Sequence, residues 1–462
     1  MLFWIVPCVL FRISLTADVP GDGPFRLVRF HPKYKFYHNF IAAIHRENFW
    51  NVQFMNLKEY VDGRPSRDEN NAIDVLIPPQ LYQPLLMFLN ESVHFDLEFV
   101  EILVEDVERS NLSHYKDIVE RLKIRQADDN KRTFQFGYHN SYTSTVSWLH
   151  KMQRRYSSIS EVFQLGVTHE GRSITGIKIG RRRSAKKAAV WIDGGIHARE
   201  WAAPHSVLYY IYMLLSSYGS DAKITEYING LDFYIVPVLN PDGYEFTQAS
   251  IENRLWRKNR SPLKCNEEGD CCQGVDLNRN FDIHWNSNSA SSSDPCKEIY
   301  HGMQSFSEPE ARAVRDKIVS PELDGRLSAF ITVHSYHQIL IYPENTEGRE
   351  VFMHFDDLKR VGEKAVETMN RLYGGNYTAG TGSDLFGGLG VILPGGASED
   401  WANAKANVKY TYCLELGPDY TFENMIMGFM LPADQLIPTA KESWEGIRVI
   451  IDAAYEESKA KM

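Results

Sequence analysis

Long hydrophobic runs are scarce in this chain of 462 residues, and the N-terminus carries the most evident one. It reads MLFWIVPCVLF, largely apolar but too short to span a bilayer. Such a run, followed by Leu15-Thr16-Ala17 as a cleavage site, is typical of a secretory signal peptide. We therefore predict a signal peptide over residues 1–17, a secreted and extracellular protein, and no membrane span.

Excess positive charge is also missing. Lys and Arg number 50 against 60 Asp and Glu, which gives a formal net charge of −10. Recognition of a phosphate backbone needs clustered positive charge, so a nucleic-acid-binding protein is excluded as an interpretation. Internal repeats and low-complexity segments are not visible.

Cysteine is sparse, with six residues in the chain. Cys8 would leave with the signal peptide, and Cys413 lies in an apolar strand, where a buried free thiol is expected. The other four crowd a polar, loop-like region: Cys265, Cys271, Cys272 and Cys296. In a secreted chain such crowding indicates two disulfides, and the spacing lacks the repeated C-x₂-C of a zinc knuckle.

Residues 25–104 show their own alternation of elements. FRLVRF, FWNVQFM, AIDVLIP and HFDLEFVEILV are predicted strands, and the segments after the first and third are predicted helices. This β-α-β-β-α-β order is ferredoxin-like. We assign residues 18–110 to a small α+β domain and 111–132, rich in charge, to a linker.

Residues 133–462 alternate longer strands with helices. AAVWID, LDFYIVPVLN, LSAFITVH and VKYTYCLEL are apolar enough to be strands buried on both faces. The pattern predicts an α/β domain with a central mixed, largely parallel sheet flanked by helices. Ser307 with Glu310, and Thr439 with Glu442, predict capping boxes at the start of two helices.

Polar residues follow two of these strands at their carboxyl ends, where sites in such sheets lie. His197 and Glu200 come just after AAVWID, and His334 ends LSAFITVH. Two histidines and a glutamate can hold a catalytic zinc and leave a fourth position for water. A single H-x-x-E among fifteen histidines is a weak signal, so the prediction depends on the three residues together.

Other residues add to this candidate site. Glu415 ends the apolar strand VKYTYCLEL, where a carboxylate is either half of a structural ion pair or a base beside a metal. Arg257, Asn278 and Arg279 come from LWRKNR and GVDLNRNF. An arginine there is either an ion-paired surface residue or a clamp for a carboxylate.

From about residue 134 onward the chain resembles the zinc metallocarboxypeptidases of the pancreatic A/B type. The resemblance rests on DGGIHAREW, LNPDGYEFT, RLWRKNRS, GVDLNRNF, VHSYHQILIYP and GFMLPADQLIPTAKESW. Carboxypeptidase A is known for a two-histidine, one-glutamate zinc site. The N-terminal β-α-β-β-α-β unit is similar to the activation segment of the same family, which covers the active site until proteolysis.

The resemblance implies a role for each matching position. His197, Glu200 and His334 would hold one Zn²⁺ per chain. Glu415 would be the base for the attacking water, and Arg257 would stabilise the developing oxyanion. The remaining implied positions are Asn278 and Arg279 for the substrate's terminal carboxylate, Arg199 and Tyr336 for neighbouring subsites, and Cys272–Cys296 for the family's disulfide. Cys265–Cys271 would be an addition of this chain.

Two positions bear on substrate binding. The family carries a mobile tyrosine shortly before its GGS-x-DW segment, but the corresponding stretch, GLGVILPGGASEDW, offers Ile392 or Val391 there. The residue two before the Trp lines the base of the specificity pocket, and here it is Glu399. A carboxylate there favours a basic C-terminal residue. The alternative is that an inserted residue turns Glu399 to solvent and leaves an apolar pocket lined by Ile341 and Cys413.

The resulting hypothesis is a secreted zymogen of a zinc exopeptidase that acts on the C-termini of peptides and proteins. A trypsin-like protease would activate it within the linker, at one of Arg121, Lys123, Arg125, Lys131 and Arg132. Three alternatives stay open: a catalytically impaired binding protein, a hydrolase of small acyl amino acids, and an A-like enzyme that prefers apolar C-terminal residues.

Overall fold

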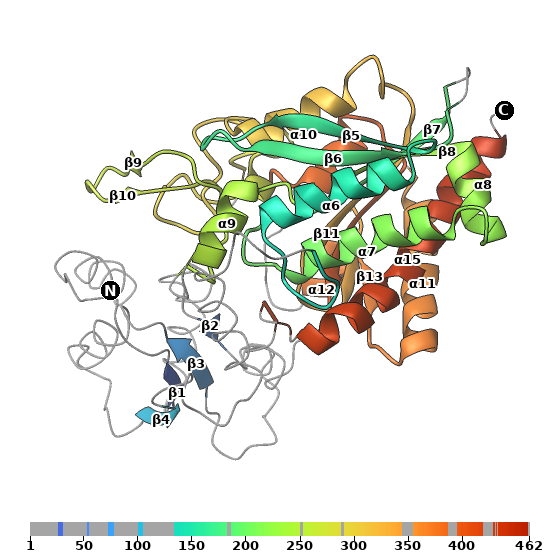
Figure 1. The fold of residues 1–462 in the computed structure, drawn as a ribbon. Helices are drawn as coiled ribbons and strands as arrows, with labels where there is room; N and C mark the ends of the chain where they lie inside the picture. Colours follow the sequence, from blue (N-terminus) through green and yellow to red (C-terminus); the bar gives the residue numbers. More distant parts are fainter. Residues whose placement is uncertain are drawn as a thin grey trace. The chain divides into compact units, whose positions relative to one another are not determined.

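The computed structural model divides the chain into two compact units, Met1–Arg121 and Leu122–Met462 (Figure 1). It describes four strands of the first unit. Of the second it describes residues 134–182, 186–249, 253–287, 291–343, 354–386, 395–418, 428–429, 431 and 433–460. The predicted signal peptide, the linker with its cleavage sites and the helices expected in the first unit lie outside the described residues.

The four described strands of the first unit fall where strands were predicted. They are β1 (Arg26–Phe30), β2 (Gln53–Phe54), β3 (Ile73–Ile77) and β4 (Val100–Val104). They form one sheet in the order β2-β3-β1-β4, and each neighbouring pair is antiparallel. The strand nearest the N-terminus therefore lies in the middle of the sheet.

The second unit alternates strands and helices along the chain. In order, its described elements are α6 (Tyr142–Arg155), β5 (Ser160–Val167), β6 (Ser173–Ile179), β7 (Ala188–Gly194), α7 (Ala202–Ser217), α8 (Ala222–Gly230), β8 (Leu231–Val236), α9 (Pro241–Ala249), β9 (Lys264–Cys265), β10 (Cys271–Cys272), the 3₁₀ helix η3 (Leu277–Arg279), α10 (Pro309–Ile318), β11 (Leu327–Ser335), β12 (Ile339–Ile341), α11 (Phe355–Tyr373), β13 (Thr378–Gly380), α12 (Gly382–Phe386), α13 (Ser398–Ala404), β14 (Tyr410–Leu416) and α15 (Ala433–Ala460).

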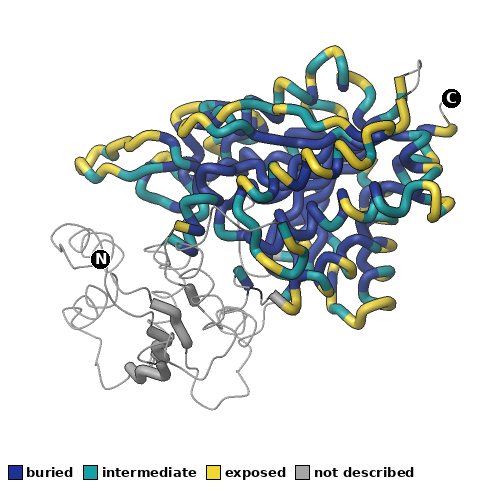
Figure 2. The backbone as a smooth tube through the Cα atoms, viewed as in Figure 1, coloured by how far each residue is buried: buried dark blue, intermediate teal, exposed yellow. Residues whose placement is uncertain are grey.

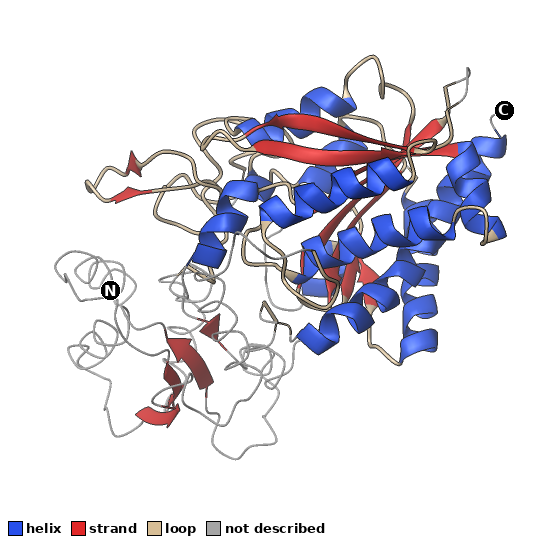
Figure 3. Ribbon diagram, in the orientation of Figure 1, coloured by secondary structure: helices blue, strands red, loops and turns tan. Residues whose placement is uncertain are grey.

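Eight of these strands form the central sheet, in the order β13-β12-β14-β11-β7-β8-β6-β5 (Figure 3). The inner strands β14, β11, β7 and β8 are parallel to their neighbours within this group. β6 pairs with β8 and β12 with β14 in the antiparallel sense. The predicted mixed, largely parallel sheet is confirmed. Because β7, β11 and β14 run the same way, their carboxyl ends meet at one edge of the sheet.

The inner strands of the sheet are buried (Figure 2), and apolar side chains pack on both faces of the sheet, which explains why these strands are so hydrophobic. On β7, Val190 and Ile192 join one core cluster, which also holds residues of α6, α7, α11 and α15. Ala189 and Trp191 point the other way, into a second cluster with residues of α10 and α13. This alternation is the two-residue period of a strand.

The two predicted capping boxes are wrong. The N-cap of α10 is Glu308, with Pro309 next, and the Ser307 hydroxyl donates to Glu308 Oε1 at 2.7 Å instead of capping the helix. α15 begins at Ala433 and continues through Pro438, so Thr439 lies inside the helix. A capping-box pattern marks a helix start only where the hydroxyl side chain is free to accept from the first turn.

None of the helices in the described part of the chain is both long and apolar enough to cross a bilayer.

Candidate metal centre and active site

A sharp turn after β7 carries two of the predicted ligands to the edge of the sheet. Gly195 has a φ of +64°, and a Cβ there would lie 2.9 Å from Cγ of Pro204. Only glycine meets both demands without strain. His197 and Glu200 follow directly and are 3% and 2% exposed. The glycines in DGGIHARE therefore let the chain turn a histidine and a glutamate back into the protein.

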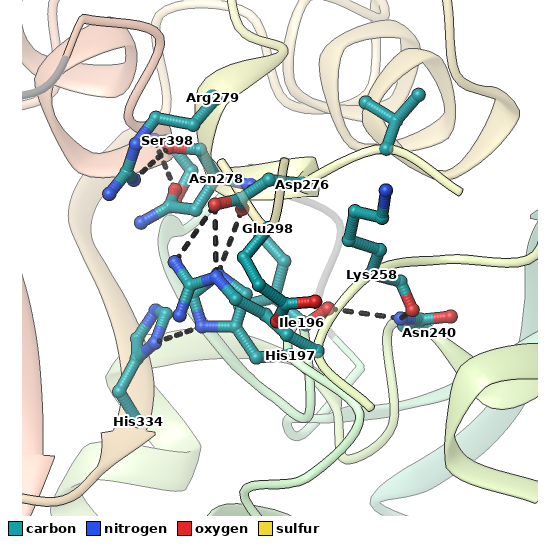
Figure 4. Close-up of polar contacts among 12 residues, drawn as sticks. Ile196, His197, Asn240, Lys258, Asp276, Asn278, Arg279, Glu298, His334 and Ser398 are labelled. Carbon is teal, nitrogen blue, oxygen red and sulfur yellow. Dashed lines mark hydrogen bonds and ion pairs between the residues drawn. The ribbon is translucent and has the colours of Figure 1, made fainter. Parts of the chain in front are cut away.

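His334, near the end of β11, meets these two residues. His197 Nδ1 lies 2.7 Å from Glu200 Oε1, and His334 Nδ1 lies 3.1 Å from Glu200 Oε2. The two Nδ1 atoms are 3.1 Å apart (Figure 4). Donor atoms of a tetrahedral zinc, each about 2.0–2.1 Å from the metal, lie about 3.3 Å from one another. The donor types and their spacing fit a single zinc ion.

The charge state of this trio also suits a cation. Burial, reinforced by the Arg257 guanidinium, lowers the pKa of His197 and so favours the neutral ring that a metal ligand needs. Burial alone would raise the pKa of Glu200, but the two imidazoles outweigh it and lower that pKa. Burial would lower the pKa of His334, whereas Cys413 and Glu200 raise it well above its usual value. The negative charge that draws a proton to His334 also draws a divalent cation.

Asp276 fixes two members of the site at once. Its Oδ1 lies 3.1 Å from His197 Nε2 (Figure 4). Its Oδ2 accepts from Arg257 Nε and Nη2, both at 2.9 Å. Burial would raise the pKa of Asp276, but Arg257, Arg279 and His197 hold it well below its usual range. An ionised Asp276 orients the His197 ring so that Nδ1 faces Glu200, as carboxylates behind zinc-bound histidines do.

A hydrogen-bonded relay stands behind His334. Thr332 Oγ1 lies 3.3 Å from His334 Nε2 and donates to Asp193 Oδ1 at 2.8 Å. Trp191 Nε1 donates to the other oxygen of Asp193 at 2.6 Å. Burial raises the pKa of Asp193 to about 6. The hydroxyl and the carboxyl together hold the ring with Nδ1 toward Glu200.

Glu415 sits on β14 beside His334. The two residues are register partners across the parallel pair β11–β14, so their side chains leave the sheet on the same face. Glu415 Oε2 is buried and has no hydrogen-bond partner among the described residues. Burial and then Glu200 raise the pKa of Glu415 to about 8. A carboxylate with a free oxygen and a raised pKa can accept a proton near neutral pH.

The segment around η3 brings Asn278 and Arg279 to the start of α13. Asn278 Oδ1 accepts from the backbone N–H of Ser398 at 2.8 Å, and Arg279 Nη1 donates to the Asn278 carbonyl at 2.8 Å (Figure 4). Gly396, with a φ of +84°, is required here because a Cβ would lie 2.1 Å from the Arg279 carbonyl oxygen.

Glu399 follows Ser398 and is 7% exposed. The Ser398 hydroxyl donates to Glu399 Oε2 at 3.3 Å. Burial raises the pKa of the Cys413 thiol to about 12, and the nearby Glu399 adds to this shift. Glu399 therefore does not turn to solvent, as the alternative required, but lies among the buried groups of this region.

Arg199 and Tyr336 come together around Phe429. The Arg199 guanidinium lies 4.4 Å from the centre of the Phe429 ring, and the Tyr336 ring packs against the same phenyl group with 5.0 Å between centroids. Arg199 Nη1 is also 3.6 Å from Glu298 Oε2. This aromatic and cationic surface includes both predicted subsite residues.

Both predicted disulfides are present, Cys265–Cys271 and Cys272–Cys296, and Cys413 is a buried free thiol. Ile392 and Val391, the two alternatives for the position of the family's tyrosine, lie outside the described residues.

Three polar residues of the site escaped sequence reasoning: Asp276, Thr332 and Asp193. Asp276 and Thr332 each stand two residues before one that was singled out, Asn278 or His334, and Asp193 lies four residues before His197. The only available signal was a polar side chain inside an otherwise apolar strand or two residues before the Asn-Arg pair. Which histidine each one faces depends on the packing of strands far apart in the sequence.

Comparison with known proteins agrees with the geometry. Residues 145–446 match the Peptidase_M14 family, zinc carboxypeptidases. Carboxypeptidase B of Astacus astacus is 36% identical over 315 residues, which are 68% of this chain and 95% of that protein. Carboxypeptidase A2 of Rattus norvegicus is 33% identical over 381 residues, 82% of this chain and 84% of that protein.

Solved structures show the same likeness. Thrombin activatable fibrinolysis inhibitor superposes with a TM-score of 0.72 at 27% identity, covering 94% of this chain and 99% of that one. Carboxypeptidase A from Helicoverpa armigera gives 0.70 at 25% identity, with 95% and 99% coverage. With its mixed eight-stranded sheet and His/Glu/His trio, the chain belongs to the zinc carboxypeptidase family and is a zinc-dependent metallocarboxypeptidase of the A/B type.

Proposed function

We propose that His197, Glu200 and His334 hold the zinc of this carboxypeptidase, with Glu415 as the general base and Arg257 as the oxyanion-stabilising group. The observation that carries the proposal is the spacing of the three donor groups, with Nδ1 and Oε atoms 2.7–3.1 Å apart, next to a buried Glu415 oxygen that has no hydrogen-bond partner among the described residues.

The reaction follows from these positions. When bound, zinc supplies Lewis acidity that polarises the scissile carbonyl and activates water. Glu415 takes a proton from the attacking water as the water oxygen bonds to the carbonyl carbon, and gives it to the amine nitrogen as the C–N bond breaks. Arg257 uses Nε and Nη2 on Asp276, and its Nη1, which lies 3.8 Å from Glu200 Oε1, would donate to the carbonyl oxygen as negative charge develops.

Removal of a single C-terminal residue requires recognition of a free carboxylate. Asn278 and Arg279 supply an amide and a guanidinium, groups that hydrogen-bond a carboxylate directly. Arg279 is half-buried, and this partial burial lowers the pKa of its guanidinium, so an anionic partner such as a substrate carboxylate would favour the charged form. Arg199 and Tyr336 would contact the residues before the scissile bond.

For the released residue we propose a basic side chain. Glu399 is buried, and its carboxylate accepts a hydrogen bond from the Ser398 hydroxyl. A buried carboxylate without a cationic partner is costly, and an incoming Lys or Arg offsets that cost. Ile341 and Cys413, register partners on β12 and β14, would supply apolar walls, and an A-like preference for apolar residues is the competing proposal.

We further propose that the chain is secreted as a zymogen and activated by a trypsin-like protease within residues 111–132. The apolar N-terminus, the two disulfides and the basic residues of the linker support this.

The test of the function uses a pair of blocked dipeptides that differ only at the C-terminus, one a free acid and the other an amide. The activated protein should release the C-terminal residue from the acid alone, and a zinc chelator should abolish release. Equal hydrolysis of the amide would contradict recognition of the carboxylate by Asn278 and Arg279.

A further inference from the structure

A second group of metal-ligand side chains lies at the start of α10, formed by residues to which the proposed reaction gives no role. His169, in the turn between β5 and β6, meets Glu308 and Glu310, and ligand atoms of the three side chains lie within 4.8 Å of one another. Glu308 and Glu310 are 5% and 0% exposed. The cluster therefore joins two segments of the chain: the β5–β6 turn supplies the imidazole, and the start of α10 supplies both buried carboxylates.

Hydrogen bonds satisfy one of the carboxylates and leave the other incomplete. Glu308 Oε2 lies 2.9 Å from His169 Nε2, and its Oε1 accepts from the Ser307 hydroxyl at 2.7 Å. Asn259 Nδ2 donates to Oε2 of Glu308 and of Glu310, at 2.7 and 3.0 Å. Glu310 Oε1 is buried with no hydrogen-bond partner among the described residues. A fully buried oxygen of this kind calls for a proton or a cation.

His169 is the cationic partner available to this pair of carboxylates. Among the described residues, the ion pairs of Glu308 and Glu310 include His169 and no lysine or arginine. Arg312, on α10 with Glu310, lies near enough to lower the pKa of His169. Its Nη1 donates to the backbone carbonyls of Phe306 and Ser307. Burial raises the pKa of Glu310 to about 7, although hydrogen bonds from Asn259 and from its own backbone N–H act to lower that pKa. The hydrogen bond to Glu308 raises the pKa of His169, so a protonated His169 can balance Glu308, and Glu310 is left to a proton or a cation.

We propose that His169, Glu308 and Glu310 form a second cation site, structural in role, that takes Zn²⁺. One imidazole nitrogen and two carboxylate oxygens are a donor set that suits zinc. The His169 side chain is 27% exposed, so an ion has a route from solvent to the buried carboxylates. Asn259, whose Oδ1 accepts from Ser261 and Val275 N–H, holds the two carboxylates side by side. The ion ties the β5–β6 turn to the start of α10.

The experiment measures zinc per chain. The full chain is stripped with chelator, equilibrated with free Zn²⁺ at slightly alkaline pH and assayed by mass spectrometry. Because surface groups elsewhere can hold zinc, the readout is the difference between variants. Glu310→Gln and His169→Gln should each hold one zinc fewer than the parent and keep the parent's activity. His150→Gln, which changes an exposed histidine of α6, is the matched control and should hold as much zinc as the parent.

Thermal unfolding gives a second readout that does not depend on turnover. Added Zn²⁺ should raise the Tm of the parent and of His150→Gln more than that of Glu310→Gln, since binding to the folded state stabilises it. If the parent and Glu310→Gln hold the same zinc and respond equally, the cluster holds a proton on Glu310 and the proposal is overturned. If a variant is less stable than the parent, its zinc content can still be compared with that of the parent at temperatures below its own unfolding transition.

Discussion

His334 and Glu415 are register partners on the adjacent parallel strands β11 and β14. The pairing puts a predicted metal ligand and the predicted base side by side at the carboxyl edge of the sheet, although 80 residues separate them in sequence. A sheet does this without strain because the carboxyl ends of parallel strands meet at one edge. The arrangement leads to five predictions.

The first concerns the relay behind His334. Thr332→Val keeps the shape of the side chain and removes the hydroxyl between His334 and Asp193. Zinc affinity, measured by competition with a chelator, should fall by about 10–100-fold, as is usual for loss of a group that orients a metal-bound histidine. Thr411→Val is the control: Thr411 is equally buried on neighbouring β14, and its hydroxyl has no partner among the described residues. Equal affinities in the two variants would show that the relay has no orienting role.

The second concerns substrate preference. The parent should release Arg and Lys from otherwise identical peptides faster than Phe or Leu. Glu399→Gln should lower kcat/KM for Arg and Lys by about 100-fold, since loss of one partner of a buried charge pair costs about 3 kcal/mol. Glu363→Gln, on the exposed face of α11, should change nothing. If the parent releases Phe and Leu faster than Arg and Lys, and Glu399→Gln does not change these rates, the enzyme is A-like.

The third concerns latency. Limited digestion with trypsin should cut within residues 121–132, and activity on small substrates should rise in step with the cut. N-terminal sequencing of the larger product identifies the bond. An uncut chain with full activity would disprove the zymogen proposal.

The fourth concerns acid stability. Burial lowers the pKa of His205 to about 4, and its Nε2 accepts from the Gly137 N–H at 3.1 Å. Between the unfolded pKa of about 6.5 and the folded value the unfolded chain binds the extra proton, so stability falls as the pH falls through this window. The loss reaches about 3 kcal/mol near pH 4. The free energy of unfolding, measured with urea at several pH values, should fall with pH more steeply in the parent than in His205→Gln. If the two proteins lose stability in parallel as the pH falls, the prediction is refuted.

Much of the fold could be predicted because its inner strands carry an unambiguous pattern. LDFYIV is buried at every position in β8, as a strand covered by helices on both faces must be. The helix starts were harder, since Ser307 and Thr439 matched a local pattern that tertiary contacts overrode. The Ser307 hydroxyl turns to Glu308, and α15 begins well before Thr439.

The candidate site was predictable in its motifs and not in its supporting contacts. His197 and Glu200 share one turn, so four residues of sequence place them together. Asp276 reaches His197 only through the packing of the η3 segment against the β7 turn. The sequence VDLNR does not reveal that one carboxylate oxygen of Asp276 faces His197 and the other accepts from Arg257. The orientation of Glu399 likewise depended on the α13 start, where Ser398 is held by Asn278.

The fifth prediction tests the central assignment, that His197, Glu200 and His334 hold the zinc while Glu415 moves the proton. The most direct measurement is the zinc content and the turnover of Glu415→Gln after activation, beside His334→Ala. Glu415→Gln should keep about one catalytic zinc per chain while kcat falls by about 10²–10⁴-fold, and His334→Ala should lose that zinc. Near-parental turnover in Glu415→Gln, or full zinc content in His334→Ala, would contradict the account.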